Sequence, residues 1–213
     1  MSRAKAHTQY KTADGIRVPG VTTVLGILAK PALIPWANRL GLQGIDSSKY
    51  VDEKADIGTC AHYLIECELK GVKPDLGDFS PNAVSDAENG YLKWLEWTKG
   101  QDLKLIGSEI GVVSERYKYG GTVDVFATLN GINTLIDIKT SGSGIWPEMR
   151  HQVAAYAMAL GETGLQQVDQ VIIVRVGRSS EEGFQTEVVG NLDKHFELFL
   201  HALAIYRLQK ELK

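Results

Sequence analysis

The sequence predicts an α/β fold in which helices flank a mixed central β-sheet. Helical patterns occupy most of the first 100 residues, whereas β-rich runs dominate from 103 to 140. A helical pattern, two further β-rich runs and a last helical pattern follow. At 213 residues, the chain is long enough to bury a substantial core. We expect a single domain over 1–213, with a mainly helical part at 1–100, a sheet-and-helix part at 101–190 and a C-terminal helix at 191–213.

Capping residues and glycines set the expected helix boundaries. Asp46 precedes one helical segment as an N-cap, and Gly71 follows that segment as a stop signal. Ser80-Pro81 starts the next helix, because proline is favoured in the first turn. We expect helices at 36–40, 49–69, 81–100, 147–160 and 192–212.

The predicted strands are β-branched and apolar runs that lie between turn signals. The run 171–176 is apolar apart from one arginine, which indicates a buried strand. The run 184–189 is expected at an edge of the sheet. We expect strands at 103–116, 122–129, 132–140, 171–176 and 184–189, and a short hairpin near Asp14-Gly15.

The most informative feature is a predicted hairpin that carries two aspartates. Asn130-Gly131 separates two β-rich runs and is the strongest short-range hairpin signal. A two-residue turn there places Asp124 directly opposite Asp137, with Lys139 on the same face because strand side chains alternate. A four-residue loop would pair Asp124 with Lys139 instead, and a three-residue loop would break the alternation. The sequence therefore predicts an acid–acid–lysine cluster on one face of the sheet.

Two opposed carboxylates in largely apolar strands need a positive partner, since buried aspartates are rarely unpaired. Lys139 alone would make the cluster a structural salt bridge. A divalent metal is the alternative, because two carboxylates together with waters and phosphate oxygens commonly hold Mg²⁺. In that case Lys139 would stabilise charge on a phosphate or help to activate the attacking water.

A glycine and a histidine share one face of the helix predicted at 49–69. Gly58 and His62 are four residues apart, which is about one helical turn. Glycine inside a helix costs about 1 kcal/mol relative to alanine, so Gly58 indicates close approach to another element. That approach would deliver His62 to the acidic cluster, and a partly buried packing histidine is the alternative.

Three more polar residues lie near the cluster in the predicted order of elements. Gln152 and Tyr156 are one turn apart on the helix after the lysine strand. The glutamine can bind water or phosphate there, and the tyrosine can position nucleic acid or Lys139. Glu109 lies on the strand before the hairpin and would add a ligand for a second metal or orient waters. The loop between that strand and the hairpin leaves its register open.

Composition narrows the class of protein. The formal net charge of −3 does not mark a nucleic-acid binder, although an enzyme that visits nucleic acid needs only a local basic lining. Two cysteines, Cys60 and Cys67, cannot supply a four-cysteine zinc site, and their spacing on one helix is too wide for a disulfide. No apolar run reaches the roughly 20 residues needed to span a bilayer, and the first residues have no apolar core of a signal peptide. We expect an intracellular, cytoplasmic protein with no membrane partner.

Taken together, these motifs resemble those of the PD-(D/E)XK nuclease superfamily. They are similar in particular to its RecB-like branch of phage and bacterial exonucleases and the mitochondrial genome-maintenance exonuclease. The branch pattern comprises a helical Gly-x-x-x-His, a strand glutamate, Gly-x-x-Asp, Asp/Glu-x-Lys and Gln-x-x-x-Tyr. The matching residues here are, in order, Gly58, His62, Glu109, Gly121, Asp124, Asp137, Lys139, Gln152 and Tyr156. Each motif is weak alone, but five in this order are specific, and the resemblance covers about residues 20–212.

The resemblance implies a restriction-endonuclease-like core that binds a divalent metal. The ligands of Mg²⁺ or Mn²⁺ would be His62, Asp124, Asp137 and the backbone carbonyl of Ile138, with Glu109 as a further ligand. Several members of this branch hold an iron–sulfur cluster with four cysteines. This chain has two cysteines, so no cluster is expected.

The implied activity is metal-dependent DNA exonuclease activity in phage or bacterial DNA recombination, repair or degradation. Lys139 would be catalytic, and Gln152 and Tyr156 would support the substrate and the site geometry. The expected partners are DNA with free ends and a single-strand annealing or other recombination protein, in a bacterium or phage-infected host cell. A structure-selective or site-specific endonuclease on the same core is an alternative. A catalytically silent nucleic-acid-binding scaffold is another, although a scaffold has no need of opposed aspartates.

Substrate contacts are harder to place along the sequence. Tyr117 and Tyr119 flank Lys118 and can stack on bases near a strand end, with packing under the hairpin as the alternative. Arg150, on the helix that follows the lysine strand, is a candidate for a phosphate contact. Further basic candidates for phosphate contacts are Lys93, Lys99, Lys104, Arg116, Arg175 and Arg178.

Overall fold

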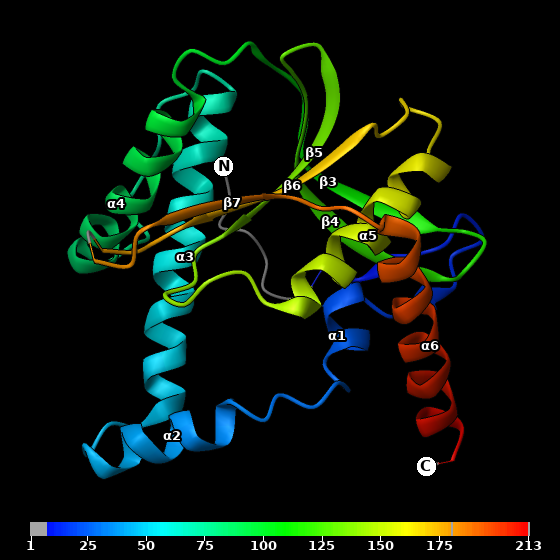
Figure 1. Ribbon diagram of the computed structural model, residues 1–213, viewed down its shortest axis with the longest axis horizontal. Helices are drawn as coiled ribbons and strands as arrows, with labels where there is room; N and C mark the ends of the chain where they lie inside the picture. The colour runs from blue at the N-terminus through cyan, green and yellow to red at the C-terminus, as the bar shows by residue number, and fades with distance from the viewer. Residues whose placement is uncertain (1–7, 180, 213) are drawn as a thin grey trace.

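The computed structural model describes residues 8–179 and 181–212 (Figure 1). Its helices are α1 (Val21–Leu25), α2 (Leu33–Leu42), α3 (Ser47–Leu69), α4 (Pro81–Thr98), α5 (Pro147–Glu162) and α6 (Leu192–Glu211). Its strands are β1 (Tyr10–Lys11), β2 (Arg17–Val18), β3 (Leu103–Ser114), β4 (Tyr119–Leu129), β5 (Ile132–Lys139), β6 (Gln170–Val176) and β7 (Phe184–Val188). The expected α/β class with a mixed sheet is confirmed.

The caps of the two long N-terminal helices are those that the sequence predicts. The Asp46 carboxylate accepts hydrogen bonds from the amides of Ser48 and Lys49 at the start of α3, at 2.8 and 3.2 Å. Ser80 caps α4 through the amide of Ala83 at 3.2 Å. These bonds satisfy amides that the first helical turn leaves without partners.

The main sheet has the order β3-β4-β5-β6-β7. Neighbouring strands are antiparallel except for β5 and β6, which are parallel. A parallel pair needs a crossover connection, and α5 supplies it. The expected edge position of the strand at 184–189 is confirmed, because β7 ends the sheet.

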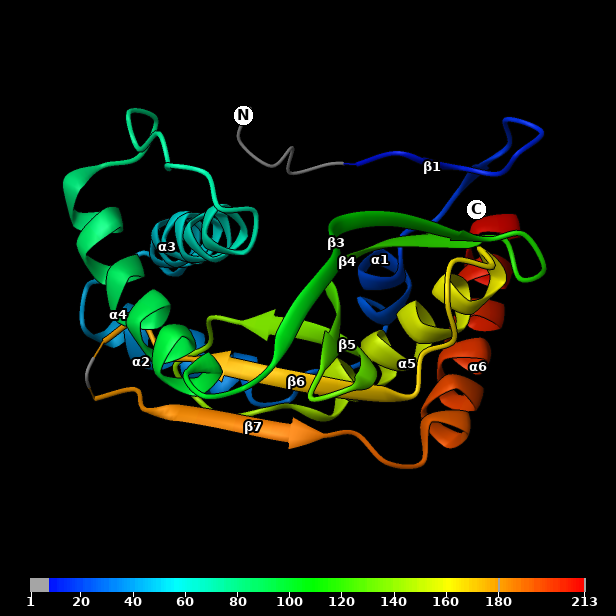
Figure 2. The same cartoon turned by 90° about the horizontal axis from the view of Figure 1, so that it is seen from above.

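Helices cover the sheet from two sides and create two apolar cores (Figures 1 and 2). Phe126 and Leu135 belong to the core shared with α1, α5 and α6. Val125 and Ile136 belong to the core shared with α3 and α4. Because side chains alternate along a strand, β4 and β5 contribute to both cores.

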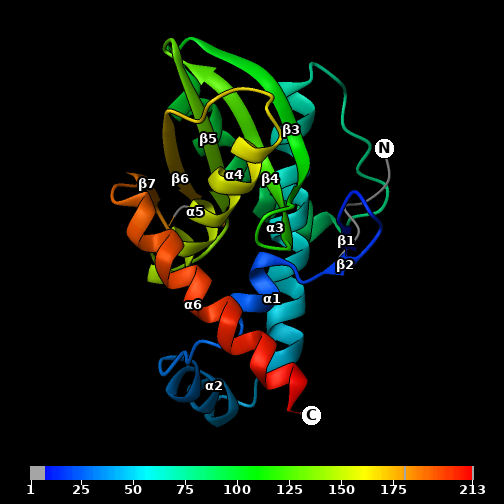
Figure 3. The same ribbon diagram turned by 90° about the vertical axis from the view of Figure 1, so that its right-hand side faces the viewer.

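The long strands β3 and β4 run side by side (Figure 3). Val123 and Val125 are two residues apart and would share one face of a regular strand. They instead belong to opposite cores. The alternation of β4 is therefore interrupted at Asp124, between the two cores.

Among the described residues, no helix combines the length and apolar character that a membrane span requires.

Candidate metal centre

The hairpin between β4 and β5 has the predicted two-residue turn. Leu129 pairs with Ile132, and the paired register runs to Val125 opposite Ile136. Asp124 is the next residue of β4, and its Oδ2 accepts a hydrogen bond from the backbone amide of Ile138 at 2.7 Å. The carboxylate of Asp124 therefore reaches the main chain of β5 beside Asp137.

Lys139 and Asp137 form the expected contact at the end of β5. Nζ of Lys139 lies 2.7 Å from Oδ2 of Asp137, and the aspartate side chain is 1% exposed. Among the described residues, Oδ1 of Asp137 has no hydrogen-bond partner. Burial of a carboxylate with such incomplete pairing costs free energy of folding, and a purely structural role does not explain that cost.

The two charges of this pair respond differently to burial. Burial raises the pKa of Asp137, which the positive charge of Lys139 opposes and the negative charge of Asp124 reinforces. Burial opposes the charged form of Lys139 too, but the carboxylates of Asp137 and Asp124 outweigh it and raise the lysine pKa. The charged form of Lys139 is therefore favoured. The charged form of Asp137 is disfavoured, because the single positive charge of Lys139 does not offset its burial.

Gly58 explains how α3 brings His62 to this cluster. A Cβ atom on Gly58 would lie 2.6 Å from Oγ1 of Thr140, just after β5. Glycine therefore allows an approach that any larger residue would block. Nδ1 of His62 lies 3.8 Å from Oδ2 of Asp124. His62 therefore lies beside Asp124, and its role as a metal ligand stays a prediction.

Glu109 also reaches the cluster, through an unusual backbone conformation. It lies between the residue pairs Ser108–Val125 and Ile110–Val123, and so opposite Asp124. Its φ of 51° is in the left-handed region, which costs about 1–2 kcal/mol for a residue with a Cβ. Burial, together with the negative charges of Asp124 and Glu66, raises the pKa of Glu109 to about 7, although part of the residue remains exposed.

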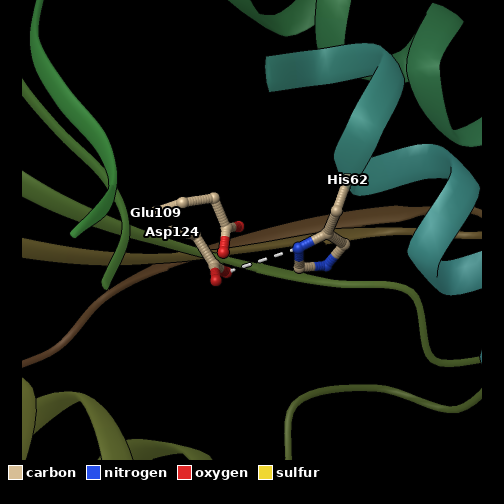
Figure 4. Close-up of side chains that lie close together, drawn as sticks. All are labelled: His62, Glu109 and Asp124. Atoms are coloured by element: carbon tan, nitrogen blue, oxygen red, sulfur yellow. Dashed lines mark ion pairs between the residues drawn. The ribbon is translucent and has the colours of Figure 1, made fainter. Parts of the chain in front are cut away.

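His62, Glu109 and Asp124 together fit a divalent metal ion. Each offers one ligand atom, and these atoms all lie within 4.8 Å of one another (Figure 4). One imidazole nitrogen and carboxylate oxygens suit Mn²⁺, and the carboxylates also suit Mg²⁺. Asp137 is not among these three residues, although its buried carboxylate lies close enough to Asp124 for the two negative charges to interact, and its role as a ligand stays a prediction. The role of the Ile138 carbonyl stays a prediction.

Tyr156 packs behind the acidic cluster on α5. Gln152 donates a hydrogen bond to its hydroxyl at 3.0 Å, and burial, followed by the charges of Asp137 and Asp124, raises the tyrosine pKa. A Cβ atom on Gly121 would collide with the Tyr156 ring, which explains the glycine in Gly-x-x-Asp. Gln152 and Tyr156 are therefore in contact with each other behind the cluster, and their role in supporting the site stays a prediction.

One expected substrate contact is wrong. Tyr119 is 0% exposed, donates its hydroxyl to the carbonyl of Ala155 at 2.8 Å, and packs edge-on against Phe199. A ring enclosed in the core has no free face for a base. Tyr117 beside it is half-buried and packs against Phe196. The alternative of packing under the hairpin is therefore the correct one for Tyr119.

Most of the basic candidates have protein partners. Arg150 forms two hydrogen bonds to Glu187, at 2.5 and 2.7 Å, and Lys118 lies 3.2 Å from Glu115. Arg175 is wrong as a phosphate contact, because it is 7% exposed and donates to the carbonyls of two loops. The remaining candidates with a contact inside the protein are Lys93, Lys104, Arg116 and Arg178.

Sequence reasoning missed one wall of the site. A pocket of about 580 Å³ includes His62, Glu109 and Asp124 and extends to Tyr63 and Phe79. A signal for Tyr63 was present in the sequence. Thr59 and Tyr63 are one helical turn apart, as are Gly58 and His62, so the two pairs lie side by side on the surface of α3. Phe79 lies in the connection after α3 and had no local signal at all.

No known family model and no curated protein matches the chain. Among solved structures, the chain is similar to a candidate exonuclease from Eubacterium rectale, with 9% identity over 70% of this chain and a TM-score of 0.45. The chain spans 64% of the length of that protein. It is also similar to the alkaline exonuclease LHK-Exo from Laribacter hongkongensis, with 13% identity over 75% of this chain and 92% of that chain and a TM-score of 0.36. LHK-Exo in complex with dAMP is similar with 15% identity over 76% of this chain and 92% of that chain, and a TM-score of 0.35. Likenesses this weak leave the function to be inferred from the chain's own residues.

Proposed function

We propose that this protein is a metal-dependent deoxyribonuclease of the PD-(D/E)XK type, in its RecB-like branch, which removes nucleotides from DNA ends. The observation that carries the proposal is the convergence of His62, Glu109 and Asp124 beside the buried pair of Asp137 and Lys139. A protein that needed only a stable fold would gain nothing from this crowding of carboxylates around one lysine.

Each residue has a distinct part in the proposed reaction. His62, Asp124 and Asp137, with Glu109 and the Ile138 carbonyl, would hold Mg²⁺ or Mn²⁺. When bound, such an ion neutralises phosphate charge and favours attack by water on the phosphodiester.

Lys139 acts through its charge. In the chain without a metal ion, the carboxylates of Asp137 and Asp124 raise the pKa of Lys139, which favours its charged form. Its ammonium group would stabilise negative charge that develops on the phosphate. Gln152 holds the Tyr156 hydroxyl, and the buried ring fixes the floor behind the aspartates.

Digestion of end-labelled oligonucleotides tests the proposal. Single- and double-stranded substrates are incubated with Mg²⁺, Mn²⁺ or EDTA, beside a covalently closed circle. We expect products that shorten from an end with either metal, no products with EDTA, and an intact circle. A nicked circle would indicate an endonuclease instead.

The Lys139→Ala variant tests the role of the lysine. We expect a folded protein by circular dichroism with activity reduced by about 10²–10³-fold. Undiminished activity would refute the assignment. If calorimetry detects no Mn²⁺ binding to the natural chain, the silent scaffold becomes the better description.

A further inference from the structure

The pocket that contains the metal centre continues past it along α3. Its volume of about 580 Å³ lies in the range of about 300–1,000 Å³ that is typical of sites for single small molecules. One face of α3 forms its wall through residues at helical spacing, which are Ala55, Gly58, Thr59, His62, Tyr63 and Glu66. We call the part of the pocket at His62, Glu109 and Asp124 its inner end and the part lined by Tyr63, Phe79, Asp75 and Asp78 its outer end.

Two aromatic rings form the outer wall. The ring centroids of Tyr63 and Phe79 are 6.1 Å apart with an interplanar angle of 31°. Phe79 also packs against the apolar cluster between α3 and α4, and the Tyr63 hydroxyl accepts a hydrogen bond from the amide of Asp75 at 3.1 Å. Both rings are thus held in place before any ligand arrives. Rigid aromatic rings beside an open space suit stacking with a nucleobase.

The charged residues of the pocket bear on how a nucleotide would be oriented in it. Asp75 and Asp78 are exposed and line the outer end, and among the described residues no lysine or arginine lines the pocket. Carboxylates repel phosphate but accept hydrogen bonds from the amino groups that nucleobases carry. Both ends carry carboxylates, but a metal ion held by His62, Glu109 and Asp124 would attract the phosphate, which leaves the base to the aromatic end.

We propose that the outer end of this pocket binds the base of one unpaired nucleotide at the DNA end, stacked on Tyr63 and Phe79. The inference rests on the proposed nuclease function and adds the substrate class, a single-stranded or frayed end. A base whose face lies against Tyr63 and Phe79 no longer stacks on the next base pair of a duplex, which favours an unpaired end.

Substrates that lack the terminal base test the stacking. We compare kcat/KM for a single-stranded oligonucleotide with a natural end and for one whose terminal residue is abasic, in Mg²⁺. We expect the abasic end to be cleaved roughly 10- to 100-fold more slowly. The Tyr63→Leu variant should cleave the natural end nearly as slowly as the abasic end, so that the ratio of the two kcat/KM values approaches one. Phe79→Leu, which keeps an apolar side chain against the α3–α4 cluster, should lower the ratio in the same way.

Tyr50→Leu is the matched control, since Tyr50 is an aromatic residue of α3 outside the pocket. It should retain the ratio of the natural chain. An unchanged thermal shift with Mn²⁺ would show that the metal centre of Tyr63→Leu is intact. Equal cleavage of natural and abasic ends by the natural chain would overturn the stacking, while the nuclease proposal would stand. Cleavage of neither substrate with Mg²⁺ or Mn²⁺ would overturn the nuclease proposal itself.

Duplex ends test the requirement for an unpaired nucleotide. A duplex with a mismatched terminal pair should be cleaved faster than a blunt, fully paired duplex, and the advantage should disappear in Tyr63→Leu. Equal rates on both duplexes for the natural chain would overturn this part of the inference.

Discussion

The two ends of the β4–β5 hairpin follow opposite rules. At the turn, Asn130 and Gly131 have φ values of 51° and 84°, which a tight two-residue turn requires. The amide of Asn130 donates to the carbonyl of Asp102 at 2.9 Å, and its side-chain oxygen accepts from the amide of Asp102 at 2.9 Å. Asn130 and Gly131 thus suit the conformation of the turn, and the backbone amides of Asn130 and Asp102 both have hydrogen-bond partners.

The open end of the same hairpin, where Asp124 and Asp137 lie, has several unfavourable features. Glu109 has a left-handed backbone, Asp137 is buried with an oxygen that lacks a partner within the described residues, and Asp124 lies against both strands. Backbone strain and incomplete pairing that gather in one place are typical of functional sites. The comparison predicts that substitutions at the open end affect activity, whereas those at the turn affect stability alone.

The largest expected effect is that of Asp124→Asn. The amide oxygen of asparagine can still accept the hydrogen bond from Ile138, so the fold should be retained. The variant loses a negative charge next to Glu109 and a ligand of the proposed metal. We expect nuclease activity to fall by about 10²–10³-fold, while the melting temperature without metal stays the same or rises.

Asp102→Asn provides the matched control for this prediction. Asp102 is an exposed aspartate beside the turn that pairs with Lys104 on the surface. Surface ion pairs contribute little to stability, so activity and melting temperature should both be close to those of the natural chain. Comparable activity losses in the two variants would erase the distinction between the ends of the hairpin.

Metal binding should give the next largest effect, and it should depend on pH. Glu109 has a pKa of about 7 in the folded chain, above its ordinary value of about 4.3. The folded protein therefore holds this proton more tightly than the unfolded chain does. Its stabilising effect is present below about pH 4 and is lost as the pH rises towards 7, and the raised pKa of Asp137 acts in the same direction. A metal ion requires the deprotonated carboxylates, so its benefit should grow with pH.

Differential scanning fluorimetry with and without Mn²⁺ measures this effect. At a metal concentration of about 100 times Kd we expect about 2.7 kcal/mol of stabilisation, or roughly 5–10 °C for a chain of this size. The increase should be larger at pH 8 than at pH 5.5. Glu109→Gln should weaken the pH dependence, and an increase that is equal at both pH values would contradict the proposed ligands.

Gly58→Ala tests the contact that holds α3 against the open end. Alanine improves helix propensity by about 1 kcal/mol but would press on Thr140, and overpacking costs about 1–3 kcal/mol. We expect a net loss of stability in urea denaturation and lower activity, because His62 would move away from Asp124. Thr140→Ala should restore both in the double variant.

Gly41→Ala on α2 shows what the same substitution does without the contact. No atom lies within 4 Å of its added Cβ, so we expect a gain of roughly 0.5–1 kcal/mol. If Gly58→Ala stabilised the protein as Gly41→Ala should, close packing would not be the reason for Gly58.

The sequence predicts the hairpin and its aspartates because the signals are local. Asn130-Gly131 specifies the turn, alternation then places Asp124 and Asp137, and one helical turn links Gly58 to His62. These inferences need no knowledge of distant contacts.

The rest of the site depends on tertiary structure. The register of β3 shifts between Leu105 and Gly107, so the position of Glu109 could not be counted along the strand. The burial of Tyr119 depends on Phe199 of α6, which is 80 residues later in the chain. Residues brought together by packing of distant elements carry no periodic signal of their own.

The smallest expected effect belongs to the turn. Gly131→Ala places a Cβ on a residue whose φ is 84°, with no neighbouring atom within 4 Å, so the penalty comes from the backbone alone. A left-handed conformation costs a residue with a Cβ about 1–2 kcal/mol, and we expect a loss of that size in urea denaturation. Specific activity of the folded fraction should be unchanged, because the hydrogen bond from Ile138 to Asp124 lies at the other end of the hairpin. A fall in specific activity below half would mean that the register set at Asn130-Gly131 also controls the acidic cluster, and the two ends of the hairpin would then be coupled.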